Sequence, residues 1–502
     1  MSPRSASRPR AAFPLVASLL LGPAQPAVAQ SPEEQARRLL EEGRNYRAQG
    51  KTKQALDNFN TIASGFSGTD SVDDALLEVG RFHLEVENDA QRAREAFEQV
   101  AQRYPQSDGA PGAYYYLGWM SLERATTAAE LEDALAQFSR VQLLYPRSEW
   151  VAKALAASGL VHRRAGRLPE AVDSSRRVSL EYPSSEAAAG AHFQVGHCLA
   201  LLGEYRQAME EFQQVRNHFP RSDWATHALN RITALYRLFA SDKPVFALDP
   251  TFSVGAGNVL KDVRALAFTP QGTLWVASDK AKSAVPFGPD GKMGPGLHGE
   301  DLRTLSLSPA RDQLLVASKI AVRIGPKDIR TFTVPIPDKP IPAPVDRVLA
   351  AALTPGGMLL VSDEERKRVL KFDAKLEYAG PFPDNREREV TRMLVDDEGG
   401  IVFLDRAEKT VKTYDEHGKL LRTLGPRGEG FELKKPVDVA LDSFLNTYVA
   451  DEVGSVRVFS PQGRLLTTLA GPELKKPKAL TLDPAGAILV YDDGSERILR
   501  YR

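Results

Sequence analysis

Two patterns of apolar spacing divide the chain. From Gln35 to about Ala240, apolar residues recur every three or four positions among Ala, Leu, Glu, Gln and Arg, which is the spacing of amphipathic α-helices. From about residue 249 to Arg502, short runs rich in Val, Leu and Thr alternate with Gly and Pro turns, which predicts β-strands. We therefore expect a multidomain α plus β protein, with helices in residues 31–240, a linker at 241–248 and strands in residues 249–502.

The helical half repeats with a period just under forty residues. Each unit holds an Ala followed four residues later by an aromatic residue, so that both lie on one face of a helix, and each unit ends in an aromatic followed by Pro or Ser. The pairs are Ala55/Phe59, Ala93/Phe97, Ala134/Phe138, Ala171/Ser175 and Ala208/Phe212, of which the fourth lacks the aromatic. A Gly at position 50, 166 or 203 precedes three of these alanines by five residues, at the expected turn within a helix pair.

This pattern resembles tetratricopeptide repeats, and the YPxS step between units is closest to the extended variety found in envelope-assembly and Tol-Pal-associated proteins of Gram-negative bacteria. The resemblance covers residues 31–240 as about five repeats. It implies an α-solenoid whose concave face binds a protein segment. The candidate groove residues on the first helices are Tyr114, Tyr115, Tyr116, Trp119, His162 and His192. The alternative is that these aromatic residues only pack between helices.

The C-terminal half repeats the unit TYVADEVGSVRVFSPQG, residues 447–463, which reads as strand, turn, strand, turn. Six copies are recognised by the Ser or Asp that ends the second strand, and these ends lie 40, 45, 42, 46 and 41 residues apart. They are Ser278, Ser318, Asp363, Asp405, Asp451 and Asp492. One such unit cannot bury its apolar face alone, so the copies must close into a ring. The last copy stops after its third strand, and we expect Thr251–Val254 to complete it.

The copies YVADEVGSVRVFSPQG and LVSDEERKRVLKFD resemble the NHL repeat, which has an acidic residue after Val-Ala and an Arg-Val-x-x-Phe third strand. The resemblance covers residues 247–502 and implies a β-propeller of six blades. The first two units carry Ser278 and Ser318 in place of Asp, so a WD-like or unclassified propeller remains the alternative.

The aligned aspartates have two interpretations. Asp396, Asp442 and Asp483 start the turn after the inner strand, where Thr or Ser stands in the other copies, and this exchange suits turn capping rather than metal ligation. Only His298 and His417 fall in this half, and no nucleotide-binding or nucleophile motif occurs. We therefore expect no catalytic residue, metal or cofactor. The alternative is a hydrolase or lyase with a metal ion in the propeller channel.

Basic residues gather just before the inner strands. The motif LKKP occurs twice, in the neighbouring fifth and sixth blades, so its lysines should lie on one face of the propeller. The predicted rim consists of Arg264, Arg303, Lys434, Lys435, Lys475, Lys476 and Lys478. Such a rim could hold another protein or an anionic surface polymer, and the alternative is ordinary solvated loop lysines.

The N-terminus resembles a secretory signal peptide, predicted for residues 1–29. Arg4, Arg8 and Arg10 precede the short apolar run AAFPLVASLLLG, and AVA offers a cleavage site before residue 30. We expect an exported chain, periplasmic or else secreted or peripheral to the outer membrane, with no transmembrane segment after cleavage. Its single cysteine, Cys198, is expected to be a buried apolar residue.

These features favour a non-enzymatic protein-binding scaffold of the bacterial cell envelope, with partners in the helical groove and on the propeller face. Lys plus Arg and Asp plus Glu are equal at 65 each, and export argues against nucleic acid as a partner. The alternatives are the channel hydrolase or lyase and a structural spacer within a larger envelope complex.

Overall fold

The computed structural model describes residues 31–502 except 126, 241–245, 255–256, 300, 309–312, 326–327, 336–341, 346, 356, 384–388, 397–398 and 416. The predicted signal peptide and most of the predicted linker therefore lie outside the described residues. One compact unit ends at Ala110, and a second runs from Pro111 to Arg502.

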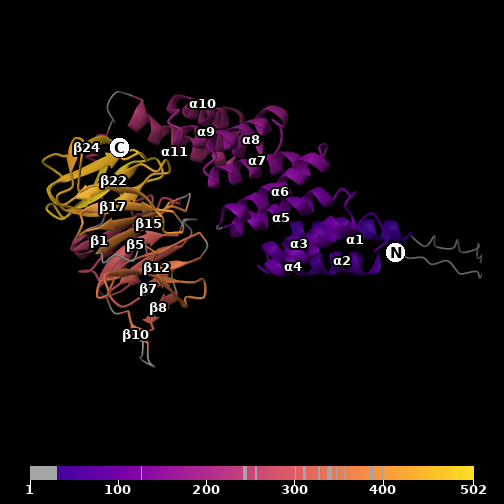
Figure 1. Cartoon of the computed structure of the whole chain (residues 1–502), viewed down its shortest axis with the longest axis horizontal. Helices are drawn as coiled ribbons and strands as arrows, with labels where there is room; N and C mark the ends of the chain where they lie inside the picture. The colour runs from indigo at the N-terminus through magenta and orange to yellow at the C-terminus, as the bar shows by residue number, and fades with distance from the viewer. Residues whose placement is uncertain are drawn as a thin grey trace, which may run out of the picture. The chain divides into compact units, whose positions relative to one another are not determined.

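The first half of the chain is a helical-repeat region, as predicted (Figure 1). Its helices are α1 (Pro32–Ala48), α2 (Thr52–Gly65), α3 (Val72–Glu85), α4 (Ala90–Arg103), α5 (Ala110–Arg124), α6 (Ala128–Leu144), α7 (Trp150–Arg164), α8 (Leu168–Glu181), α9 (Ala188–Leu201), α10 (Tyr205–His218) and α11 (Asp223–Phe239). They form five helix pairs followed by α11, among the residues that are described. No helix in these residues has the length and apolar content needed to cross a bilayer.

The repeating aromatic residues fill space that glycines leave on the preceding helix. The rings of four of them are fully buried, and a Cβ on the glycine opposite would lie 2.4–2.9 Å from the ring. The pairs are Gly43/Phe59, Gly80/Phe97, Gly118/Phe138 and Gly196/Phe212. In the fourth unit Ser175 replaces the ring, and its Oγ lies 2.4 Å from the Cβ position of Gly159. Four of the five helix pairs are therefore held together by a ring packed on a glycine, and the pair α7/α8 by the smaller Ser175.

The second half is a six-bladed β-propeller, and each described sheet is antiparallel with its strands in sequence order. Blade one consists of β1 (Val263–Phe268), β2 (Leu274–Ser278), β3 (Ser283–Phe287) and β4 (Leu297–His298), and blade two of β5 (Leu302–Leu307), β6 (Leu314–Ser318), β7 (Val322–Ile324) and β8 (Asp328–Arg330). Blade three consists of β11 (Val348–Leu353), β12 (Leu359–Asp363), β13 (Arg368–Phe372) and β14 (Tyr378–Pro381), and blade four of β15 (Val390–Val395), β16 (Ile401–Asp405), β17 (Thr410–Tyr414) and β18 (Leu420–Leu424). Blade five consists of β21 (Pro436–Leu441), β22 (Thr447–Asp451), β23 (Ser455–Phe459) and β24 (Leu465–Leu469), and blade six of β25 (Pro477–Leu482), β26 (Ile488–Asp492) and β27 (Arg497–Tyr501). Small hairpins, β9 (Thr333–Val334) with β10 (Ala343–Pro344) and β19 (Arg427–Gly428) with β20 (Phe431–Glu432), lie between blades, and a 3₁₀ turn, η1 (Gly257–Leu260), precedes β1. The second strands end at the six residues predicted from the sequence.

The ring is closed by a short extended segment at residues 247–249. Ala247 exchanges two backbone hydrogen bonds of 2.9 Å with Arg502, and the N–H of Asp249 donates to the carbonyl of Arg500 at 2.8 Å. The prediction that Thr251–Val254 supplies this strand is wrong. The Asp249 carboxylate accepts hydrogen bonds from both the N–H and the hydroxyl of Thr251, which turns the chain away from the sheet.

The last helix packs on the propeller within the second compact unit. Phe444, in the turn after β21, joins the apolar core formed by α8, α9, α10 and α11. A guanidinium N–H of Arg237 donates to the carbonyl of Ala485 at 2.6 Å, in the turn after β25. Both turns follow inner strands, so α11 lies at the end of the ring where the inner strands finish.

Gly486 gives a test of this packing. Its φ is +76°, and a Cβ there would lie 3.0 Å from the Cβ of Ala234 on α11. The equivalent Gly357 has φ +78° but meets only the Cβ of Ala374, at 3.5 Å. We expect Gly357→Ala to lower the free energy of unfolding by about 1 kcal/mol through backbone strain alone. Gly486→Ala should cost at least about 1 kcal/mol more, because α11 must shift.

Urea denaturation of both variants measures this difference. Equal losses would contradict the packing of α11 on this turn.

Candidate functional site

A groove runs over the first helices of the last repeats. It has a volume of about 710 Å³ and is lined from α5, α7, α9 and α11. Its aromatic lining residues are Tyr115, Tyr116, Trp119, Trp150, Phe193 and Trp224. Small residues, Ala156, Ala157, Ala187 and Gly190, lie between them. A concave, largely apolar surface on rigid helices is suited to binding a segment of another protein.

Three of the predicted groove residues, Tyr115, Tyr116 and Trp119, do line the groove. His162 does not line the groove. Burial and the nearby charge of Arg167 lower the pKa of its imidazole. Tyr114 instead packs on Tyr145 with ring centroids 6.1 Å apart.

His192 is also absent from the groove lining. Its Nδ1 lies 2.8 Å from a carboxylate oxygen of Glu211 on α10. Sequence reasoning missed Trp150, Phe193 and Trp224, although a signal for two of them exists. Trp150 and Trp224 are 74 residues apart, which is twice the 37-residue repeat step, so they occupy equivalent positions.

The groove contains more positive than negative charge. Lys153, Arg163 and Arg231 line it, whereas Glu186 is its only carboxylate among the described residues. Lys153 pairs with Glu186 at 3.0 Å and lies over the ring of Trp150, 4.9 Å from its centroid. The guanidinium of Arg231 lies over Phe193 at 5.8 Å.

The middle of the propeller is tied together by a buried ion pair. Arg392 on β15 lies 3.0 Å from Asp438 on β21, and their side chains are 6% and 5% exposed. Arg392 also donates to the hydroxyl of Thr304 on β5 at 2.6 Å, and the N–H of Leu480 on β25 donates to Asp438 at 2.7 Å. Burial raises the pKa of Asp438, and the charge of Arg392 opposes this shift. Four inner strands are therefore linked through one carboxylate and one guanidinium.

A cavity of about 110 Å³ lies between these inner strands and α11. Its lining includes Arg231 and Ala234 of α11, Arg392, and the turn aspartates Asp442 and Asp483. The two turn carboxylates already accept backbone hydrogen bonds within their own turns, from Phe444 and Ala485 among others. These carboxylates therefore shape turns at the end of the channel.

The strand-end aspartates accept backbone hydrogen bonds, as the sequence indicated, but Asp451 takes them from the loop before its inner strand and not from the next turn. Asp451 accepts hydrogen bonds from the N–H groups of Lys434 and Lys435 at 2.9 and 2.8 Å, and Asp363 accepts from Glu365 and Arg366. In the turns after the inner strands, the side-chain oxygens of Asp, Thr and Ser make the same type of bond. The pairs are Thr269 with Thr273, Ser308 with Gln313, Thr354 with Met358, Asp396 with Gly400, Asp442 with Asn446 and Asp483 with Ala487.

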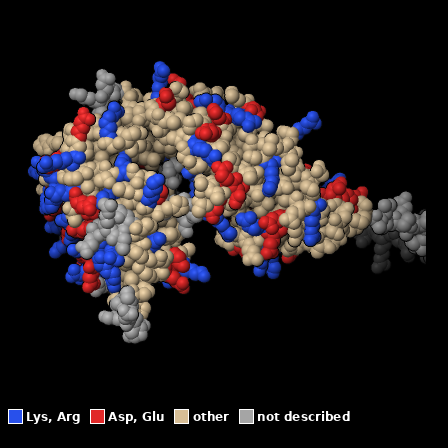
Figure 2. Space-filling view, in the orientation of Figure 1, with Lys and Arg blue, Asp and Glu red and all other residues tan. Residues whose placement is uncertain are grey.

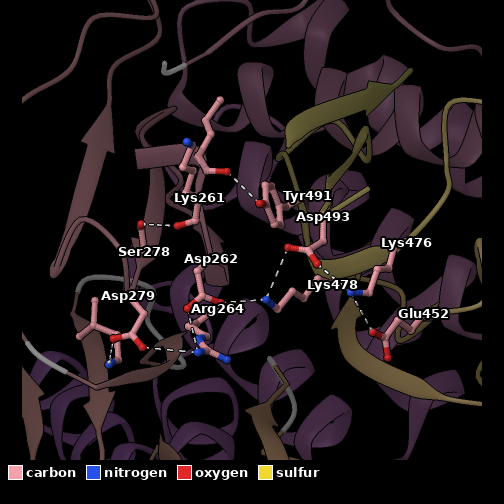
Figure 3. A network of polar contacts seen from close by, with 12 residues as sticks. Lys261, Asp262, Arg264, Ser278, Asp279, Glu452, Lys476, Lys478, Tyr491 and Asp493 are labelled. Atoms are coloured by element: carbon pink, nitrogen blue, oxygen red, sulfur yellow. Dashed lines mark hydrogen bonds and ion pairs between the residues drawn. The ribbon is translucent and has the colours of Figure 1, made fainter. Parts of the chain in front are cut away.

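The predicted basic rim lies on the entry face, which we define as the loops that lead into the inner strands together with the turns between second and third strands. Figure 3 shows three of its cations, Arg264, Lys476 and Lys478, alternating with carboxylates from three blades. Lys476 lies 3.6 Å from Glu452 and 2.9 Å from Asp493. Lys478 lies 2.9 Å from Asp262, which in turn pairs with Arg264 at 2.9 Å.

The entry face is therefore of mixed charge. Lys435 also pairs with Glu452, and this contact, opposed by burial, lowers the pKa of Glu452. Lys434 and Lys475 are exposed, and Arg303 is half-buried on β5. Over the whole side of the molecule drawn in Figure 2, basic and acidic side chains are interspersed. Most of the predicted rim cations come together, but they do so with their counterions.

One further group of carboxylates lies in the first compact unit. Asp73, Asp74 and Asp108 bring oxygens within 4.8 Å of one another. Asp73 accepts a hydrogen bond of 2.9 Å from the N–H of Gly109, and Asp74 pairs with Arg44 at 2.9 Å. The chain's own donors thus engage two of these three carboxylates.

Comparisons with known proteins agree with the repeat architecture. A family model described as a tetratricopeptide repeat matches residues 74–107 and 191–222. No curated protein sequence matches the chain significantly.

Solved structures match the propeller half. A streptogramin B lyase is 10% identical with a TM-score of 0.37 and covers 51% of this chain and 97% of its own. A virginiamycin B lyase from Staphylococcus aureus is 13% identical with a TM-score of 0.37, covering 51% and 88%. A protein of unknown function from Bacteroides thetaiotaomicron is 13% identical with a TM-score of 0.37, covering 52% and 73%. Similarity at this level says nothing about the activity of this chain.

Proposed function

We propose that the chain is a non-enzymatic protein-binding scaffold of the bacterial cell envelope, and that the groove over α5, α7, α9 and α11 is its principal docking site. The observation that carries this proposal is the lining itself. Aromatic side chains such as Tyr116, Trp150 and Trp224 are only partly buried, and Trp224 is 41% exposed. Partly exposed aromatic residues on rigid helices are typical anchors of protein interfaces.

The buried ion pair in the middle of the propeller supports the proposal that the chain is not an enzyme. Asp438 is engaged by Arg392 and by two backbone N–H groups, from Val439 and Leu480. A carboxylate held in this way braces inner strands and is poorly placed to act as a base or a metal ligand. We therefore assign the propeller to binding and support, and we infer that it is of the NHL type.

The entry face is the weaker of the two candidate surfaces. Its cations already pair with Glu452, Asp493 and Asp262 on the same face. An anionic polymer would have to displace these contacts, and exposed ion pairs that alternate in sign create little net field. A protein surface of mixed charge is the better match for this face.

Site-specific photo-crosslinking in intact cells tests the proposal. A benzophenone amino acid at Trp224 should give a discrete crosslinked protein, because this residue is in the groove and partly exposed. The same amino acid at Asp173, an exposed residue of α8, is the matched control and should give none. On fractionation of these cells we expect the chain in the envelope, without residues 1–29. No adduct from the groove, or the same adducts from both positions, would contradict the scaffold proposal.

A further inference from the structure

The groove has two aromatic clusters, one at each end. The first joins α5 to α7: Trp150 lies 5.3 Å from Tyr115 and 5.6 Å from Tyr116, measured between ring centroids. The second joins α9 to α11, where Phe193 and Trp224 lie 4.9 Å apart. Each cluster offers partly exposed ring faces against which a bulky apolar side chain can pack.

The helices between the clusters, α7 and α9, contribute several small residues to the lining among larger ones. Ala156 and Ala157 of α7 and Ala187 and Gly190 near the start of α9 contribute almost no side-chain bulk. A Cβ on Gly190 would lie 3.3 Å from the indole of Trp224, so this glycine also lets the second cluster sit close to α9. A polypeptide backbone can therefore approach α7 and α9 closely at these positions, while the exposed ring faces at both ends offer packing surfaces for bulky side chains.

The distance between the two aromatic clusters sets the number of residues between the two anchor side chains of a bound segment. The first cluster is centred between α5 and α7 and the second between α9 and α11, which is a separation of two helix spacings. Packed helices lie about 8–10 Å apart, so the clusters are about 16–20 Å apart. An extended chain rises about 3.3 Å per residue, so about five or six residues span this distance.

The charged residues of the groove indicate the charge of the segment that would bind there. Lys153, Arg163 and Arg231 line the groove together with a single carboxylate, Glu186, which pairs with Lys153. We propose that the groove binds an extended acidic segment of a partner protein that carries two bulky apolar side chains about five or six residues apart. This inference rests on the proposed scaffold function. The chain's own N-terminal segment has Arg4, Arg8 and Arg10, so its charge does not suit the groove.

Selection from a random peptide library on the purified full chain tests this inference. We expect enriched peptides to have two aromatic or large aliphatic residues at this spacing, with Asp or Glu between them. The best peptide, labelled with fluorescein, should bind at least about tenfold more weakly to Trp150→Ala and to Trp224→Ala, as for anchor residues of an interface. Its affinity should also fall as salt rises from about 0.05 M to about 0.5 M.

The matched control is the double variant Leu143→Ala and Leu180→Ala. These leucines are 79% and 74% exposed and lie outside the groove, on α6 and α8, so peptide binding should change by less than about twofold. Circular dichroism of every variant should match the parent protein. A chain lacking residues 1–30 should bind the peptide as the full chain does, and binding about tenfold tighter would identify that segment as the occupant and overturn the inference.

Enrichment of basic peptides, of peptides without the apolar pair, or of none at all would also overturn it. So would equal binding to the parent and to Trp150→Ala. The scaffold proposal fails separately, when the crosslinker at Trp224 captures no partner. A captured partner that has no acidic two-anchor segment would overturn the present inference alone.

Discussion

Replacing Asp438 with Ala is expected to lower the free energy of unfolding by about 3–5 kcal/mol, because it leaves a buried guanidinium without its counterion. The side chain of Arg392 is only 6% exposed, so bulk water solvates the guanidinium poorly once the carboxylate is lost. The N–H of Leu480 also loses its acceptor. Urea denaturation followed by circular dichroism at neutral pH measures the loss.

The double variant Arg392→Met with Asp438→Leu is the matched control. It removes both charges, and apolar replacement of a buried ion pair often restores stability. We therefore expect the double variant to be more stable than Asp438→Ala. A loss below about 1 kcal/mol in Asp438→Ala would show that the pair is solvated, and a double variant no more stable than the single one would refute this account.

Replacing Phe444 with Ala is expected to cost about 3–5 kcal/mol and to separate the unfolding of the helices from that of the propeller. Phe444 is 2% exposed, and its ring packs among residues of three helices. Its centroid lies 6.5 Å from that of Phe212 and 6.0 Å from that of His197. Arg231 of α11 also lies over this ring, 5.4 Å from the centroid.

Calorimetry distinguishes these effects. The parent protein should show its helices α7–α11 melting together with the propeller, whereas Phe444→Ala should resolve two transitions. Phe382→Ala is the matched control: this ring is 3% exposed and packs on Phe403 and Tyr414 inside the propeller. It should lower stability by a similar amount without dividing the transition. Division in both variants, or in neither, would argue against Phe444 as the link.

The architecture could be predicted because a weak sequence pattern becomes informative when it recurs at a fixed period. One Ala followed by an aromatic says little, but the same pair in successive units identifies the period, and Phe97 and Phe212 are buried as this pattern requires. The turn chemistry was predictable for the same reason. Exchange of Asp442 for Thr269 or Ser308 at one turn position indicated a hydrogen bond to the backbone, which all six turns make.

The contacts between units could not be predicted in this way. Arg392 and Thr304 are 88 residues apart and meet only because the ring brings β5 and β15 together. Thr304, Arg392 and Asp438 occupy the same position of their inner strands, where the other three blades carry Ala. Aligning the repeats therefore marks this position, but it does not show which of its residues meet across the ring. Phe444 likewise looked like an ordinary turn residue, although it packs into the helical core.

The sequence predicted the basic residues of the rim but not the carboxylates that pair with them, for a related reason. Lys476 and Lys478 are close in sequence, and a cluster of positive charge follows from that proximity alone. Their partners Glu452 and Asp262 come from the neighbouring blades on either side. Only the closed ring brings these carboxylates to the lysines.

Closure of the ring by residues 247–249 also bears on the order in which the protein is made. These residues precede all six blades, whereas their pairing partner, β27, is the last strand to be synthesised. The closing segment therefore has to remain without its partner strand while the whole propeller emerges. Domains generally fold from the N-terminus as synthesis proceeds, so α11, which ends at Phe239, can be in place before β27 exists. The helical array would then hold the start of the ring close to the site where its end must arrive.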